Sequence, residues 1–189
     1  FGENDWTDLD WDKTTDYFVS KTRAEKAAWE LMESKGLKNN FTCINPGCVL
    51  GDFLNEKNCT SMEYVKQLLQ GKFPAAPKFS VMISHVKDIA KAHVLSLTNK
   101  RAGGRRLIVG SEVRSILELS QIMAKNIPSH AKKLPKRELP NFMVKLLSYV
   151  DTSAKNMVPD LGLKMQTDQT YAEDILQMKF IASEIAVVD

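Results

Sequence analysis

The pattern of apolar and polar positions divides the chain into alternating strands and helices. Short apolar runs bounded by polar or turn-forming residues predict β-strands at residues 41–46, 79–85 and 106–109. Longer stretches with apolar residues at helical spacing predict α-helices at residues 15–35, 60–70, 86–97, 116–126, 142–150 and 168–184. This alternation of strands and helices predicts an α/β fold.

Signals at helix ends support several of these helices. Gly36 follows the first one, at a position where glycine commonly ends a helix. The pairs Thr60 with Glu63 and Ser115 with Glu118 match the capping box that opens a helix. The helix after residue 85 is expected to turn one apolar stripe toward the core. This stripe comprises Val86, Ile89, Ala90, His93, Val94 and Leu97.

Tyr17 and Lys21 are the first candidates for chemistry. They lie four residues apart in the first predicted helix, so their side chains share one helix face. A lysine charge beside a phenol favours the phenolate, which makes the pair a candidate acid/base device. One spacing is not specific, but a second landmark follows, where the strand at 41–46 runs into a Pro-Gly turn.

Three ordered motifs resemble those of the extended short-chain dehydrogenase/reductase family, within the NAD-dependent epimerase/dehydratase superfamily. The run from Tyr17 to Lys26 resembles its Y-x-x-x-K catalytic helix, and the run from Asn45 to Gly51 resembles its N-P-x-x-V-x-G strand end. The run from Ile83 to His93 is similar to its H-V-x-D-x-A-x-A-H segment. The similarity is strongest to dihydroflavonol-reductase-like and 3β-hydroxysteroid-dehydrogenase-like members, and it fades after about residue 126.

This resemblance implies the C-terminal part of a Rossmann-type parallel sheet plus a smaller substrate-binding lobe. Residues 1–50 would then close the Rossmann domain with the catalytic helix and the following strand. Residues 51–189 would form the lobe, with 79–110 returning to the Rossmann core. No G-x-G-x-x-G motif occurs in the 189 residues. We therefore expect the C-terminal part of a longer reductase, inactive without its cofactor-binding part.

The resemblance also implies roles for six residues and a cofactor, NADP or NAD. Tyr17 would exchange a proton with a substrate carbonyl or hydroxyl, and Lys21 would favour the phenolate and bind the nicotinamide ribose. The turn after the strand would lie against the nicotinamide carboxamide, mostly through backbone groups. This turn comprises Pro46, Gly47, Cys48 and Val49.

The function implied is an NAD(P)-dependent carbonyl reductase or alcohol dehydrogenase that acts on a medium-sized, partly apolar substrate. Two alternatives stay open. One is a nucleotide-sugar epimerase or dehydratase, which shares the tyrosine–lysine pair and the fold. The other is a catalytically silent, cofactor-sensing protein of the same fold, although such a protein would not need to retain Tyr17 and Lys21.

Charge and composition favour a small-molecule partner over nucleic acid or membrane. The net charge is +3, and no aromatic residues interleave the basic clusters at 100–106 and 132–137, as a nucleic-acid surface would require. No apolar run approaches the ~18 residues of a membrane span. We expect a small-molecule carbonyl or alcohol as partner, and a homodimer as the assembly to test.

Cysteines and histidines give no metal-site pattern. Cys43, Cys48 and Cys59 lack metal-ligand spacing and do not pair evenly, which favours a reducing compartment, and we expect the cytoplasm. His85 and His93 lie eight residues apart without a third ligand at zinc spacing. We therefore expect structural roles for both histidines and no metal.

Overall fold

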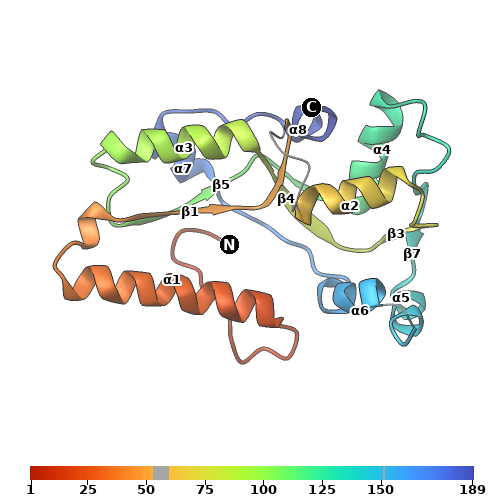
Figure 1. The fold of residues 1–189 in the computed structure, drawn as a ribbon, viewed down its shortest axis with the longest axis horizontal. Coiled ribbons are helices and arrows are strands. Elements are labelled where there is room, and N and C mark those ends of the chain that lie inside the picture. The colour runs from red at the N-terminus through yellow and green to blue at the C-terminus, as the bar shows by residue number, and fades with distance from the viewer. Residues whose placement is uncertain (53–59, 151) are drawn as a thin grey trace.

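The computed structural model describes residues 1–52, 60–150 and 152–189 (Figure 1). The strands are β1 (Thr42–Pro46), β2 (Cys48–Leu50), β3 (Ala76–Pro77), β4 (Ser80–His85), β5 (Arg105–Val109), β6 (Val113–Ser115) and β7 (Glu138–Leu139). The helices are α1 (Asp16–Ser34), α2 (Thr60–Leu69), α3 (Val86–Thr98), α4 (Ile116–Asn126), α5 (Asn141–Leu147), α6 (Thr152–Met157), α7 (Thr170–Leu176) and α8 (Ser183–Val188). Two 3₁₀ turns, Lys38–Asn40 and Val158–Asp160, complete the described elements. The α/β fold predicted from the sequence is confirmed.

The described strands form three small sheets, the third of which joins β3 and β7. β1 pairs in parallel with β5, ending with Pro46 opposite Val109. β2 pairs in parallel with β4, starting with Cys48 opposite Ile83, and β4 pairs antiparallel with β6. β3 and β7 pair in parallel. Since Gly47 alone separates β1 from β2, the chain moves there from the edge of β5 to the edge of β4.

Helices pack on β1 and β5 to form one apolar core. α3 contacts β1 and β5, while α7 contacts β5 and α3. Figure 1 shows α3 on one side of β1 and β5 and α1 on the other. Apolar side chains from α3, β5 and α7 are removed from water here, which stabilises this packing. The buried core residues are Ala92, Ala102, Leu107, Val109, Ala172, Ile175, Leu176 and Met178.

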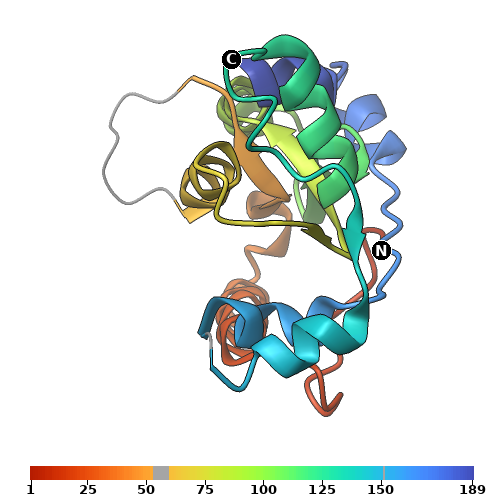
Figure 2. The same ribbon diagram turned by 90° about the vertical axis from the view of Figure 1, so that its right-hand side faces the viewer.

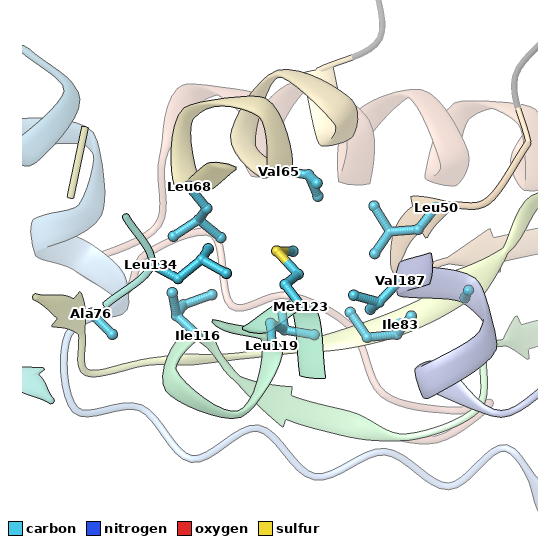
Figure 3. Packing of buried hydrophobic residues seen from close by; sticks show 11 residues of the cluster. Leu50, Val65, Leu68, Ala76, Ile83, Ile116, Leu119, Met123, Leu134 and Val187 are labelled. Atoms are coloured by element: carbon cyan, nitrogen blue, oxygen red, sulfur yellow. The ribbon is translucent and has the colours of Figure 1, made fainter. Parts of the chain in front are cut away.

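A second core lies between β2, β4 and the helices α2, α4 and α8. α8 contacts both α4 and β4, and α2 contacts β2. In Figure 3, Met123 of α4 lies among side chains that come from all of these elements. This core therefore holds α8, the C-terminal helix, against β4, the strand with which β2 pairs. Its larger members are Leu50, Val65, Leu68, Ile83, Ile116, Leu119, Met123, Leu134 and Val187.

Local end signals in the sequence are confirmed where the structure describes them. Ser115 Oγ accepts a hydrogen bond from the Glu118 N–H, and the Glu118 carboxylate accepts one from the Ser115 N–H, as a capping box requires. Gly36 has a left-handed φ of 66° directly after α1. The side chain of Thr60, the other predicted cap, lies outside the described residues. The three predicted strands are present, each starting within one residue of its expected position.

The prediction for the buried face of α3 is wrong in its second half, although Ile89 of the predicted stripe does pack against the first core. Val94 and Leu97 are 65% and 85% exposed, whereas Asp88 and Ala92 are buried. Asp88 faces inward because its carboxylate accepts a hydrogen bond of 2.7 Å from the Ile181 N–H, far along the chain. This long-range contact, rather than the local pattern of apolar residues, orients the helix.

The single helix predicted at 168–184 is also wrong, because two short helices occupy this stretch. α7 ends at Leu176, and Gln177 follows with a left-handed φ of 51°. Beyond this break, the Phe180 N–H donates to a side chain of α7 in place of a helical carbonyl, since the Glu173 carboxylate accepts from it at 3.2 Å. α8 then begins at Ser183 and covers the second core.

Candidate active site

Tyr17 and Lys21 lie at the start of α1, on its solvent side. The helix begins after Thr15, whose hydroxyl accepts a hydrogen bond from the Phe18 N–H. Tyr17 is 63% exposed, and the Lys21 Nζ atom lies 5.7 Å from the centre of its ring. The helix thus brings the two predicted side chains together, as their spacing requires. An exposed phenol with an ammonium group beside it is accessible to a small molecule.

Polar contacts, rather than an apolar core, fasten α1 to the sheet. Thr22 is the only residue of the helix that is fully buried. The Glu25 carboxylate accepts two hydrogen bonds from the Arg106 guanidinium of β5, at 2.7 and 3.2 Å, and a third from the Trp29 indole. The Trp6 ring lies 3.8 Å from the Arg106 Cζ atom. Arg106 therefore links α1, β5 and the N-terminal segment.

The electrostatics of this contact hold Glu25 in its charged form. Burial by itself would raise the pKa of Glu25, but hydrogen bonds from Arg106 and Trp29 and the Arg106 charge outweigh it, and the pKa is lowered. Cys43 of β1 lies close by, and burial together with the Glu25 charge raises the pKa of its thiol to about 12. The thiol is therefore protonated at neutral pH and has no nucleophilic role here.

The turn that the sequence links to the nicotinamide lies where β1 gives way to β2. Because α1 and β1 run in opposite directions, the start of α1 and the end of β1 both lie away from the turn that joins them, near the middle of the molecule (Figure 1). Gly47 approaches β4 very closely, since a Cβ atom added to it would lie 2.2 Å from the Met82 carbonyl oxygen. Cys48 and Val49 are half-buried, while Pro46 is exposed.

Sequence reasoning missed Ser84, which supports this turn. Its side chain is fully buried in β4. The Ser84 Oγ atom accepts a hydrogen bond of 2.8 Å from the Gly47 N–H and donates one of 2.7 Å to the Val109 carbonyl oxygen. The available signal was a serine inside an otherwise apolar strand, because a buried hydroxyl needs partners.

Residues of the third motif hold the C-terminal segment. The buried His85 ring accepts from the Lys87 N–H through Nδ1, so its Nε2 carries the proton and donates to Asp189 at 3.2 Å. Burial raises the pKa of Asp88, and the hydrogen bond from the Ile181 N–H opposes this rise. His93 is exposed and its Nδ1 lies 2.8 Å from the Ile89 carbonyl oxygen. His85 and His93 thus have structural contacts, as the sequence predicts.

An aromatic cluster lies on the other side of the turn. The Tyr64 ring of α2 packs against Phe73 and Phe79, at 5.5 and 6.4 Å between ring centres. Its hydroxyl is buried and has no hydrogen-bond partner in the part of the chain that the structure describes. Burial, with a smaller effect of Cys48, raises the pKa of this phenol. Tyr64 is therefore a neutral hydroxyl close to Cys48 and not an acid/base group.

Arginines of the first basic cluster have partners within the fold. Arg101 forms an ion pair with Asp174, and Arg105 forms one with Glu3 at 2.7 Å. Together with Arg106, these side chains connect segments that are distant in the sequence. Among the described residues, no helix has the length and apolar character that crossing a membrane requires.

Comparison with known proteins links this geometry to a family. Cinnamoyl-CoA reductase 1 of Arabidopsis thaliana is 30% identical over 177 residues, which are 93% of this chain and 49% of that protein. Dihydroflavonol 4-reductase of the same plant is 34% identical over 142 residues, 69% of this chain and 35% of that protein. The chain is thus similar, over most of its length, to reductases of the extended short-chain dehydrogenase/reductase family. No protein-family model matches it.

The extended short-chain dehydrogenase/reductase fold is confirmed by solved structures. The crystal structure of Gre2 from Candida albicans in complex with NADPH superposes with a TM-score of 0.74 at 25% identity. It matches all of this chain, while the chain covers 55% of that structure. The chain thus spans about half, or less, of the length of the relatives it matches. Its strands and helices correspond to part of their Rossmann-type architecture.

Proposed function

We propose that this chain supplies the acid/base side of an NAD(P)H-dependent carbonyl reductase. The observation that carries this proposal is the Tyr17–Lys21 pair, exposed at the start of α1 in a chain whose relatives are named as reductases. The same names favour a reductase over the nucleotide-sugar epimerase alternative. Carbonyl reduction adds a hydride to carbon and a proton to oxygen, and Tyr17 would supply the proton.

In this mechanism Tyr17 donates its hydroxyl proton to the substrate oxygen. The Lys21 ammonium favours the phenolate that remains, since an opposite charge nearby stabilises the charged form. Lys21 would also bind the ribose hydroxyls of NADP or NAD, and the backbone of Pro46, Gly47, Cys48 and Val49 would meet the nicotinamide carboxamide. When bound, the nicotinamide supplies the hydride.

The domain assignment is part of the proposal. Residues 1–50 would close a dinucleotide-binding domain, residues 79–110 would return to it, and the rest of 51–189 would form the substrate lobe. One observation supports this division. Within the described residues β1 pairs with β5 alone, so its other edge is open to a further strand.

We propose a medium-sized, partly apolar carbonyl compound as substrate. The relatives are named for cinnamoyl-CoA, dihydroflavonol and methylglyoxal, which all contain a reducible carbonyl group. α5 carries several exposed apolar side chains and is followed in the chain by α6. α6 lies beyond the N-terminal end of α1, the end that carries Tyr17 (Figures 1 and 2). The exposed apolar side chains of α5 are Phe142, Met143, Leu146 and Leu147. They would receive the apolar part of the substrate.

The test is turnover by the purified protein that carries this chain, followed as NADPH consumption with cinnamaldehyde or methylglyoxal. Tyr17→Phe should lower kcat by at least roughly 100-fold, the usual contribution of a general acid, and leave the Kd for NADPH within about twofold. Tyr149→Phe is the matched control for the loss of an exposed phenol hydroxyl, because this tyrosine is 87% exposed and has no proposed role in catalysis or cofactor binding. NADPH binding without turnover would favour the cofactor-sensing alternative.

Location and assembly belong to the same proposal. We expect the protein in the cytoplasm, since the cysteine usage favours a reducing compartment. We expect it to act without nucleic acid, because Arg101, Arg105 and Arg106 are engaged with carboxylates of the chain itself. A homodimer is the assembly to test by light scattering, and cell fractionation tests the location.

A further inference from the structure

Gly47 is the point at which one extended segment changes its strand partner. Up to Pro46 the segment pairs with β5, and from Cys48 onward it pairs with β4. At such a transition a backbone N–H group loses its ladder partner, and a half-buried N–H needs another acceptor. Gly47 thus depends on a side chain from a neighbouring element.

Ser84 provides this acceptor. One hydroxyl can accept one hydrogen bond and donate another, and the Ser84 Oγ atom does both, from the Gly47 N–H and to the Val109 carbonyl oxygen. The side chain is fully buried beside Ile83 in β4. It therefore joins β4 to the ends of both β1 and β5 through two short hydrogen bonds.

We propose that Ser84 is a positioning residue for the cofactor-contacting turn, an inference that rests on the proposed function above. A peptide group is planar and trans, so the N–H of one residue and the C=O of the residue before it point in opposite directions. With its N–H directed at Ser84, Gly47 orients the carbonyl of Pro46 away from β4. Ser84 would thereby set the direction of a backbone acceptor for the amide of the nicotinamide carboxamide without contacting the cofactor.

The close packing of the turn makes this hydroxyl hard to replace. The Gly47 Cα atom lies so near β4 that an added Cβ would overlap the Met82 carbonyl group, and an added Cβ at Gly110 would lie 2.8 Å from Met82 Cγ. Two glycines thus let the ends of β1 and β5 approach β4 at the place that Ser84 bridges. Loss of the hydroxyl leaves the Gly47 N–H and the Val109 carbonyl without their partner.

The experiment compares Ser84→Ala with Ser120→Ala in the protein that carries this chain. Ser120 is equally buried, and its hydroxyl likewise donates to a carbonyl oxygen, that of Ile116, but it lies in α4. Ser84→Ala should raise the Kd and the KM for NADPH roughly tenfold, with kcat at saturating NADPH within about twofold of the wild type. Ser120→Ala should leave the Kd for NADPH unchanged, even if it lowers the melting temperature as much as Ser84→Ala does. Amide exchange at Gly47 should accelerate only in Ser84→Ala.

Each outcome has a distinct meaning. If wild type binds NADPH and Ser84→Ala binds it equally well, the positioning role is wrong and the proposed function stands. If wild type does not bind NADPH, the proposed function fails and this inference fails with it. Should Ser84→Ala not fold, Ser84→Cys keeps a weak acceptor and should give an intermediate Kd. If neither variant folds, Ser84 serves folding alone and the inference is overturned.

Discussion

Replacing Arg106 by alanine should destabilise the protein more than replacing an arginine of an exposed ion pair. Arg106 gives Glu25 two hydrogen bonds in a paired geometry, with the two side chains only 17% and 14% exposed. Removing one partner of a buried ion pair costs about 3–5 kcal/mol, because the other charge stays buried and unpaired. Partial exposure places this pair at the lower end, so we expect Arg106→Ala to lower the free energy of unfolding by about 3 kcal/mol.

Arg105→Ala is the matched control for this experiment. Arg105 precedes Arg106 in β5 and also pairs with a carboxylate, that of Glu3, but its side chain is 45% exposed. Exposed pairs contribute about 1 kcal/mol or less. Urea unfolding of both variants at neutral pH, with equal m-values, measures the difference. If the two substitutions lower the free energy of unfolding equally, α1 is not held by the Arg106 contact and this reasoning fails.

The acid limb of the stability curve gives a second measurement of the same contact. The pKa of Glu25 is lowered in the folded protein, so its contribution is present above the unfolded-state pKa of about 4.3 and is lost as the pH falls through the folded-state value. The difference in stability between wild type and Glu25→Gln should therefore be full at neutral pH and shrink in acid. A difference that stays constant down to acid pH would show that Glu25 is not charged in the native state.

Three further predictions concern the turn and the C-terminal segment. Gly47→Ala should cost roughly 1–3 kcal/mol and weaken NADPH binding, because its Cβ would overlap the Met82 carbonyl; an unchanged melting temperature would contradict the close approach. Gln177→Gly should raise the free energy of unfolding by up to about 1 kcal/mol in urea unfolding, because glycine adopts a left-handed φ without strain. A lower free energy of unfolding would show that the contacts of the Gln177 side chain outweigh this strain. Asp88→Ala should cost about 2 kcal/mol and accelerate amide exchange at Ile181, whereas Asp88→Asn, which keeps an acceptor oxygen, should cost less.

Much of the fold follows from signals that lie within a few residues of one another. Thr15 and Ser115 cap their helices by accepting from N–H groups three positions away, so the sequence alone marks these starts. The Tyr17–Lys21 pair also depends only on helical spacing, and the structure keeps the two side chains adjacent. Each of these features needs no knowledge of what the element packs against.

Features that depend on partners distant in the sequence could not be predicted from the local pattern of apolar and polar residues. The inward face of α3 is set by the bond between Asp88 and the Ile181 N–H, 93 positions along the chain. At the break at Gln177, the N–H groups of Gln177 and Phe180 both donate to Glu173 of α7, and a helical pattern of apolar residues continues through the break. Ser84 reaches Gly47, 37 positions earlier, across a change of strand partner that no periodicity reveals. In each case a buried polar group decides the local geometry.

The helix that carries Tyr17 and Lys21 and the turn at Gly47 are both attached to β5. Arg106 of this strand holds α1 through Glu25, and the carbonyl of Val109 in the same strand holds Ser84, which holds Gly47. An extended strand is nearly inextensible along its axis, so the two attachment points keep a fixed separation. Both attachments are hydrogen bonds with defined directions rather than apolar contacts that can slide. We therefore expect the placement of Tyr17 relative to the turn at Gly47, on which the proposed reaction depends, to be sensitive to Arg106, Glu25 and Ser84.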